Sequence, residues 1–275
     1  MQPQRHQLTG PPHTYYVTAQ CALRQELLAG PEAQHFLDLV ADLCRCVDGN
    51  LFAYAIDADA YHLIIQHRDQ VLDADQELQR RWRSFGGAAQ AAQPDRLRTR
   101  FASLGGIMQT LAQRYSRAWH QRNGGRGGIW AERYRACLLA DASALLCAVA
   151  WLEYGRAQGS LLSSRGRHQR DSDPPLALLP LREHSDGSVL TADSEGLLLV
   201  PPAAERIQSL LDSFAAELDA EAYTAYEHAL THGWALGRPE SLIEATARLG
   251  RSTGRGRSRR IRELDDQLGL CGFWG

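Results

Sequence analysis

The sequence predicts an α+β protein with a ferredoxin-like core, an antiparallel sheet with helices on one face, followed by a helical C-terminal region. Its 275 residues are 44% hydrophobic and 23% charged, an ordinary globular composition with enough apolar residues for a substantial core. Hydrophobic periodicity gives the element order strand, helix, strand, strand, helix, strand, helix. Pairing these strands antiparallel, with both crossover helices on one face, produces the ferredoxin-like arrangement with one added helix.

The first elements are the clearest. Residues 13–20 are rich in aromatic and β-branched side chains, which predicts a strand. Pro31 stands at a helix-start position, and apolar residues then recur at helical spacing as far as Val47. Residues 51–56 and 61–66 are short apolar runs separated by an aspartate-rich turn, which predicts a β-hairpin.

The middle of the chain continues this pattern. Residues 67–100 are charged and rich in Ala and Gln, with Gly and Pro as breakers, and are interpreted as an inserted helix and linker. Residues 101–123 have helical spacing, and residues 129–139 have an extended pattern. Asp141 is then expected to cap a helix over 144–154.

These elements divide the chain into four parts. They are a core at 1–159 with the insertion around 67–100, a linker at 160–202, a helical C-terminal region at 203–249 and an Arg-rich tail at 250–275. Helical patterns in the C-terminal region lie near 203–218, 220–232 and 239–249. Because the tail holds few apolar residues, its deletion is expected to weaken binding to a polyanion without abolishing the fold.

Charge is strongly segregated along the chain, although the formal net charge is only −2. Residues 1–95 hold 7 Arg against 12 acidic residues, 96–170 hold 13 against 3, 171–247 hold 3 against 14, and 248–262 hold 7 and no acid. All 30 basic residues are arginines, and a coding bias toward arginine is enough to explain the absence of lysine. Since guanidinium matches phosphate with a planar bidentate fork, the clustering favours a nucleic-acid partner over a merely solvated surface.

Cysteine usage and hydropathy indicate the cellular compartment. The six cysteines form no CxxC pair and no Cys/His cluster with zinc spacing, so they are predicted to be reduced thiols packed as small apolar groups. No apolar run reaches the ~18 residues that indicate a membrane span, and the polar start lacks the apolar stretch of a signal peptide. The expected location is cytoplasmic.

Seven segments occur in an order that is specific when they are taken together. They are His13-Thr-Tyr-Tyr-Val-Thr18, Phe52-Ala-Tyr-Ala-Ile56 with His62-Leu-Ile-Ile65, Arg80-Arg-Trp82, the helical stretch 108–119, Gly128-Ile-Trp-Ala-Glu-Arg-Tyr134, the stretch 138–146 and His232-Gly-Trp-Ala-Leu-Gly237. This set resembles the single-tyrosine HUH transposases, in particular the REP-associated tyrosine transposases. The resemblance runs from about residue 8 to residue 250.

Members of that family cut single-stranded DNA, commonly near hairpins. The resemblance implies a Mg²⁺ or Mn²⁺ ion held by the two histidines of a His-x-His strand triplet, and a helix-borne tyrosine that attacks the phosphate to form a 5′-phosphotyrosine link. An amide-bearing third ligand follows the tyrosine by four residues. Strand alternation places both imidazoles on one face, and helical spacing places the tyrosine and the amide on one side of the helix.

This sequence departs from the family at three of these four positions. The matching triplet is Ala60-Tyr61-His62, so alanine replaces the first histidine and only His62 remains. Trp151 takes the place of the nucleophile, and Gly155 takes that of the third ligand. Because an indole has no ionisable hydroxyl and a glycine has no side chain, the sequence predicts a catalytically inactive protein that uses no cofactor.

A rebuilt site is the alternative. Tyr154 lies about 60° around the helix from Trp151 and is the candidate substitute nucleophile. Asp57 and Asp59 offer oxygen ligands beside His62, for which Mg or Mn would be the metal. Turn aspartates more often satisfy backbone groups, so no metal is predicted beyond weak ligation at His62.

The candidate binding residues are arginines around the glycine loop at 124–128, after the core and in the tail. They are Arg114, Arg117, Arg122, Arg126, Arg133, Arg135, Arg165, Arg167, Arg255, Arg257, Arg259 and Arg260. Trp119, Trp130, Tyr134 and Trp151 interleave aromatic rings with this charge, which suits stacking of splayed bases, and at least half of them are expected in the core.

The sequence therefore predicts a transposase-like protein that binds hairpin or single-stranded DNA without cleaving it. RNA and a homodimer stay open as further partners, and no membrane partner is predicted. One alternative is an active metal-dependent DNA strand-transferase or nuclease with substituted ligands. The other is a protein-interaction module in which the acidic region 171–247 docks a partner.

Overall fold

The computed structural model describes residues 12–47, 49–67, 75–85, 93–155, 161–163, 191–193, 196–199, 220–248, 261–265 and 270–273. The strands are β1 (His13–Gln20), β2 (Asn50–Ile56), β3 (Ala60–His67), β4 (Arg135–Leu139), β5 (Leu162–Ser163), β6 (Thr191–Asp193), β7 (Gly196–Leu199), β8 (Ala235–Gly237), β9 (Ile261–Asp265) and β10 (Leu270–Phe273). The helices are the short 3₁₀ helix η1 (Ala22–Arg24), α1 (Pro31–Val47), α2 (Asp75–Ser84), α3 (Pro94–Phe101), α4 (Leu104–Asn123), α5 (Ala142–Ala150), the π-helical turn η3 (Trp151–Gly155), α8 (Ala220–His232) and α9 (Pro239–Arg248).

The main sheet has the strand order β5-β2-β3-β1-β4-β8-β10-β9. Within it, β2, β3, β1 and β4 are antiparallel neighbours, and α1 and α4 are the crossover helices. This is the ferredoxin-like arrangement, so the predicted fold class is confirmed. Strands β6 and β7 form a separate antiparallel pair.

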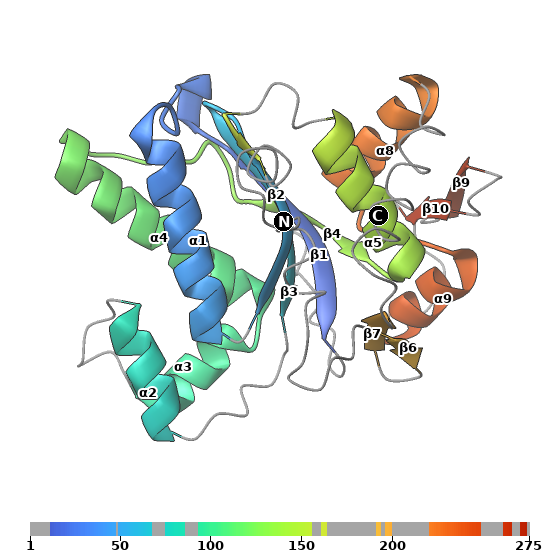
Figure 1. Ribbon diagram of the computed structural model, residues 1–275, viewed down its shortest axis with the longest axis horizontal. Helices are drawn as coiled ribbons and strands as arrows, with labels where there is room; N and C mark the ends of the chain where they lie inside the picture. The colour runs from blue at the N-terminus through green and yellow to red at the C-terminus, as the bar shows by residue number, and fades with distance from the viewer. Residues whose placement is uncertain are drawn as a thin grey trace, which may run out of the picture.

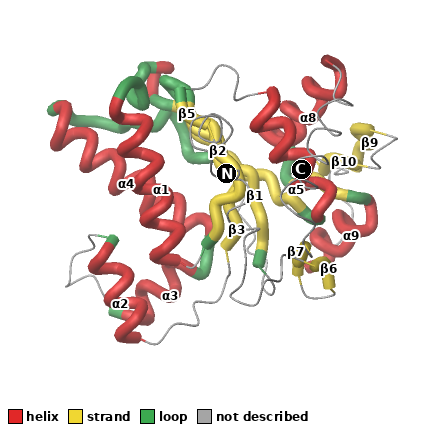
Figure 2. Tube along the Cα trace, in the orientation of Figure 1, coloured by secondary structure: helices red, strands yellow, loops and turns green. Residues whose placement is uncertain are grey.

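Helices cover both faces of the sheet (Figure 1). The crossover helices α1 and α4 lie on one face with α2 and α3 beside them, and α5 and α8 lie on the other. The tube in Figure 2 shows the strands running between these two groups of helices. The second helical layer is an addition to the predicted core.

Side-chain alternation along β3 divides the core into two halves. Tyr61 and Leu63 belong to the half under α1 and α4, and Ile64 belongs to the half under α5 and α8. His62, which has the same parity as Ile64, faces the second half. In register, His62 lies opposite Thr18 of β1 and opposite Ala55 of β2.

The helix starts follow their capping residues. Pro31 opens α1, and the apolar face that follows is buried. Ser103 caps α4 by accepting a 3.0 Å hydrogen bond from the Gly106 N–H, and Asp141 caps α5 by accepting a 2.9 Å bond from the Ala144 N–H. The Ser103 cap also separates α3 from α4, so the single helix predicted over 101–123 is wrong at its start. A Cβ at Gly106 would lie 1.9 Å from the Arg100 carbonyl oxygen, so only glycine fits this turn.

The extended pattern predicted for 129–139 forms a strand only over β4. Before it, Trp130 makes one isolated antiparallel bridge with Cys21, and the Ala22 N–H donates to the Ile129 carbonyl at 2.7 Å. The insertion around 67–100 contains two described helices, α2 and α3, where one was predicted.

The C-terminal region differs from the expected helices and tail. Helices α8 and α9 occur as predicted, but β8 pairs in parallel with β4 and extends the core sheet. The segment 250–275 contains β9 and β10, which pair with each other, and β10 pairs with β8. Leu270 is fully buried, so β10 belongs to the fold, whereas the Arg-rich run at 251–260 lies outside the described residues. The helix predicted near 203–218 and most of the linker at 160–202 lie outside the described residues.

Two further sequence predictions concern cysteines and membrane spans. All six cysteines have free thiols, and only Cys44 is not fully buried, as expected for small apolar groups. Among the described residues, no helix combines the length and the hydropathy that crossing a bilayer requires.

Candidate functional site

His62 sits at the centre of a buried aromatic cluster. Only 5% of its surface is exposed, and its Nδ1 lies 2.6 Å from the Tyr16 hydroxyl. Its Nε2 lies 3.4 Å from Oδ2 of Asp57, in the turn between β2 and β3. If Tyr16 donates to Nδ1, the imidazole carries its proton on Nε2, facing the carboxylate. The retained histidine thus has a structural hydrogen bond on one nitrogen and a carboxylate on the other.

Trp151 closes this cluster from the other side. It ends α5 and begins the π-helical turn η3, and its backbone N–H contacts the carbonyls of Ala148 and Cys147. The indole is fully buried, edge-to-face with Tyr16 (centroids 5.7 Å apart) and His62 (6.4 Å) and stacked on Tyr223 (5.7 Å). The structure therefore brings together His62 and Trp151, the two positions that the resemblance links, with the indole filling the space between sheet and helix.

The other two positions are placed by the same elements. Ala60 is buried at the start of β3, opposite Gln20, and shares a strand face with His62. Gly155 is the last residue of η3. The side chain of Tyr154, the candidate substitute nucleophile, lies outside the described part of the chain.

The donor set around His62 does not fit a divalent metal. Of the two aspartates considered as oxygen ligands, Asp57 approaches the imidazole, whereas Asp59 accepts a 3.2 Å hydrogen bond from Gln20. The Tyr16 hydroxyl already engages one ring nitrogen. Within the described ranges, no three His, Cys, Asp or Glu side chains come together as metal ligands. At this position the imidazole of His62 is contacted at both ring nitrogens, and the Asp57 carboxylate is the group on Nε2.

Four of the predicted binding arginines are exposed on α4 and on the segment that leads into β4. Arg117 lies on α4 and Arg126 in the glycine loop. Arg133 lies just before β4, and Arg135 is the first residue of β4. Arg135 also lies 3.6 Å from Glu132, with both side chains more than half exposed. These guanidinium groups are accessible to a polyanion.

Two other predicted arginines make contacts within the protein. Arg122 donates two hydrogen bonds, of 3.0 and 2.6 Å, to the carboxylate of Glu32 at the start of α1. The same carboxylate accepts from Asn123 and from the Tyr115 hydroxyl, and chiefly because of Arg122 the pKa of Glu32 falls to about 2. Arg114 lies over the Phe85 ring at 4.3 Å and is partly buried, which lowers its pKa. Arg122 and Arg114 therefore link the helices of one layer.

The remaining predicted arginines lie outside the described residues. They are Arg165, Arg167, Arg255, Arg257, Arg259 and Arg260.

The glycine loop after α4 is held by His120. Gly124, Gly125 and Gly127 have φ values of 75°, 92° and 120°, which residues other than glycine rarely adopt. The two ring nitrogens of His120 lie 3.3 and 3.0 Å from the carbonyl oxygens of Gly124 and Gly127. The loop is thus a defined turn that returns the chain to the sheet.

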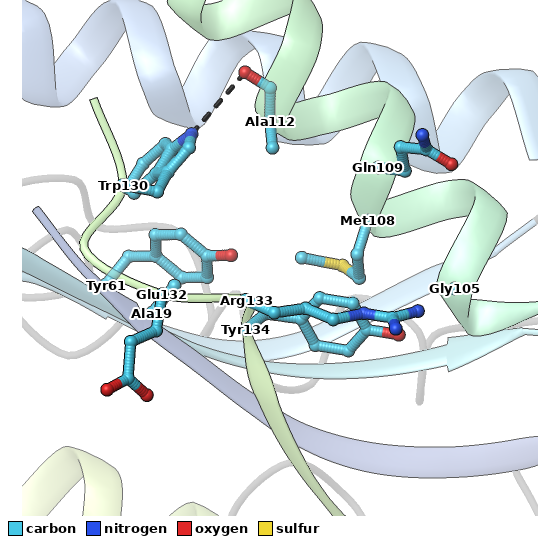
Figure 3. A pocket seen from close by; sticks show the side chains of 10 residues that line it. All are labelled: Ala19, Tyr61, Gly105, Met108, Gln109, Ala112, Trp130, Glu132, Arg133 and Tyr134. Carbon is cyan, nitrogen blue, oxygen red and sulfur yellow. Dashed lines mark hydrogen bonds between the residues drawn. The ribbon is translucent and has the colours of Figure 1, made fainter. Parts of the chain in front are cut away.

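A pocket of about 420 Å³ lies between the first half of α4 and the segment before β4, on the sheet face opposite His62. Its walls include Tyr61, Met108, Trp130 and Tyr134, with Arg133 at its edge (Figure 3). Sequence analysis singled out the aromatic residues at 130 and 134 but not the pocket, because Tyr61 and α4 reach it only through the tertiary fold.

Comparisons with known proteins find matches among solved structures. No protein-family model matches the chain, and no curated protein matches it. Among solved structures, it is similar to a REP-associated tyrosine transposase bound to a REP hairpin. The alignment covers 73% of this chain and 99% of that chain, with 13% identity and a TM-score of 0.38.

Proposed function

We propose that this protein binds hairpin or single-stranded DNA and does not cleave it. The observation that carries the proposal is the burial of Trp151 against His62 and Tyr16, at the position where the sequence resemblance places a nucleophile. A second observation, the exposed arginines on α4 and before β4, supports retention of binding.

The chemistry at the buried cluster argues against strand cleavage. The indole of Trp151 has no hydroxyl to attack a phosphate, and Ala60 has no ligand atom. A phosphodiester would reach the imidazole of His62 only after the indole had left the core, since the two rings are in contact and both are buried. Polarisation of a phosphate at this position therefore requires a different packing of η3 on the sheet.

In this proposal, the exposed arginines supply the electrostatic part of the affinity for nucleic acid. Arg117 and Arg126 are exposed at the end of α4 and in the following loop, and each can neutralise one phosphate of a nucleic acid. Neutralisation of phosphates releases counterions, so binding through these residues depends steeply on salt.

The first experiment is a gel-shift titration of the full chain with hairpin, single-stranded and duplex DNA over a salt series. Wild-type protein is expected to bind the hairpin or the single strand more tightly than the duplex. The double variant Arg117→Gln/Arg126→Gln is expected to bind more weakly, with a salt slope that is shallower by about 2.

The matched control removes the same charge elsewhere. Arg45 on α1 and Arg80 on α2 are 74% and 76% exposed, so Arg45→Gln/Arg80→Gln changes the net charge equally and is expected to keep the wild-type slope. No binding by the wild type at low salt to any DNA or RNA probe would refute the proposal and favour a protein-interaction module.

A second experiment tests the absence of cleavage. Labelled hairpin DNA is incubated with the protein and Mn²⁺, and a covalent protein–DNA adduct is sought on a denaturing gel. We expect none. An adduct that disappears in Tyr154→Phe would establish the alternative, an active strand-transferase or nuclease with substituted ligands.

A further inference from the structure

The pocket lined by Tyr61 and Trp130 is a second site, separate from the His62 cluster. Adjacent residues of β3 point to opposite faces of the sheet, so Tyr61 lines this pocket while His62 packs on Trp151. The pocket lies between the N-terminal half of α4 and the segment from Trp130 to Tyr134, which leads into β4. It has a volume of about 420 Å³, within the range of small-molecule sites.

Flat aromatic surfaces form its walls. Tyr61 and Trp130 meet at nearly a right angle, 87°, with their centroids 5.3 Å apart, and Figure 3 shows both rings bordering the same space. Tyr134 and the thioether of Met108 lie further along the pocket. Tyr61, Met108 and Tyr134 are only 3%, 1% and 7% exposed, so the partly exposed Trp130 offers a planar, aromatic ligand most of the contact area.

The wall residues are fixed by their surroundings. Tyr61 stacks on Phe36 of α1 at 4.7 Å, and Trp130 packs against Tyr115 of α4 at 5.7 Å. The indole N–H of Trp130 donates to the Ala112 carbonyl at 3.4 Å. The rings therefore keep their positions before a ligand arrives, which reduces the entropic cost of binding.

Polar groups occur at the edge of the pocket. Arg133 is exposed and lies along Tyr134, with its guanidinium carbon 5.9 Å from the ring centroid. Gln109 is exposed on α4 at the outer side of the pocket, and Glu132 points away from the rings (Figure 3). A cation at the edge of an aromatic pocket suits a ring that carries a phosphate, and an amide can pair with the edge of a base.

We propose that this pocket receives one unpaired nucleobase of a bound nucleic acid, with the phosphate of that nucleotide beside Arg133. The inference rests on the proposed function and names the part of the ligand that this site contacts. We take the ligand to be a nucleic acid and not a free nucleotide, because the exposed Arg126 and Arg135 precede and follow Arg133 in the sequence and offer charge to further phosphates; Arg135 also lies 3.6 Å from Glu132.

The test fills the pocket without disturbing its walls. Gly105 lies on α4, and the atoms nearest to a Cβ built there belong to Arg133, Tyr134 and Ser103, at 3.5 to 3.8 Å, which is ordinary contact. The variant Gly105→Leu therefore adds a side chain at the pocket edge and improves helix propensity. The matched control is Gln113→Leu, which adds the same side chain at an exposed position of α4 that does not line the pocket.

The readout is an abasic scan of a short DNA hairpin with an unpaired loop and single-stranded flanks. For wild-type protein and for Gln113→Leu, removal of the base at one unpaired position is expected to raise the Kd about fivefold to a hundredfold. In Gly105→Leu, the intact probe is expected to bind as weakly as that abasic probe, with no further loss. A thermal melt of each variant shows that it is folded.

Four outcomes would overturn the inference. No base enters the pocket if wild-type protein binds every abasic probe with the same Kd as the intact probe. The same conclusion follows if the Kd values of Gly105→Leu across the abasic scan equal those of the wild type. In both cases the proposed DNA binding stands. If nucleoside monophosphates bind saturably and only Gly105→Leu abolishes this, without effect on the hairpin, the ligand is a free nucleotide. If wild-type protein binds no nucleic acid at all, the proposed function fails first and this inference fails with it.

Discussion

The imidazole of His62 and the indole of Trp151 lie edge to face across the interface between β3 and η3, with an angle of 68° between their planes. The first residue is the retained half of a metal-binding triplet in the sequence resemblance, and the second replaces its nucleophile. Their contact is part of the hydrophobic core under α5 and α8, since Trp151, Tyr16 and Tyr226 are all fully buried there. Both side chains thus contribute to packing of the core.

Replacement of Trp151 by alanine is expected to destabilise the fold by about 3–5 kcal/mol, the usual cost of removing a large buried ring. Trp151→Phe keeps part of the ring packing and should cost clearly less. Chemical denaturation with fixed m-value analysis measures both changes. An unfolding free energy of Trp151→Ala equal to that of the wild type would show that the indole is not a core residue.

Introducing two of the groups that the family resemblance implies is not expected to produce cleavage. In Ala60→His/Trp151→Tyr, the position of the third ligand is still Gly155, and the new hydroxyl lies in a fully buried position. No covalent adduct with hairpin DNA should form in the presence of Mn²⁺, as judged on a denaturing gel. Formation of an adduct by this variant would mean that the site opens to substrate and that two ligands suffice.

The carboxylate of Glu32 is expected to make stability depend on pH in the acid range. Because Arg122, Asn123 and Tyr115 all donate to it, its pKa is about 2 in the folded chain, below the ordinary value of about 4.3. This contribution to stability is complete above the unfolded pKa and is lost as the pH falls from about 4.5 toward 2. Glu32→Gln should lower the unfolding free energy at neutral pH by about 1–3 kcal/mol and flatten the curve in that window.

An exposed carboxylate provides the comparison for Glu32. Glu77 on α2 pairs with Arg80 and Arg81 in contact with water, so solvent screening should make the effect of Glu77→Gln on stability the smaller of the two. Equal effects of the two substitutions would contradict the assignment of Glu32 as a link between α1 and α4.

The last strand is expected to be required for stability. Leu270 of β10 is fully buried, and β10 pairs with both β8 and β9. Leu270→Asp places a charge in this core and should lower the thermal transition by several degrees or abolish it. Leu23→Asp, at a position that is 88% exposed, should leave the transition nearly unchanged. The reverse order of these effects would support the original expectation of a dispensable tail.

The elements that the sequence predicted best are those with strong local patterns. The strand at His13–Gln20, the helix from Pro31 and the hairpin around Asp57 each combine periodicity with a turn or capping residue, and each occurs as expected. The strand β8 was missed because its three residues, Ala235–Gly237, are too short to alternate. They form a strand only because β4 and β10 lie on either side.

The candidate site was predictable where one element defined it and not where distant elements meet. The alternation around His62 indicated its face of the sheet, and helical spacing indicated that of Trp151. Nothing near Arg122 in the sequence indicated that it pairs with Glu32 at the start of α1, because that contact joins two helices across the fold. The pocket likewise depends on Tyr61 and Trp130, which long-range packing brings together.

The parallel pairing of β4 with β8 has a consequence for biosynthesis. A ribosome synthesises β4 well before β8. Until β8 is made, β4 is an edge strand of the nascent sheet, with unpaired backbone N–H and C=O groups. Such an edge is a template for pairing with other chains, and the emerging polypeptide needs either rapid completion or a chaperone until β8 docks. Prematurely terminated products that end before β8 are therefore expected to aggregate, whereas the completed chain pairs this edge of β4 with β8.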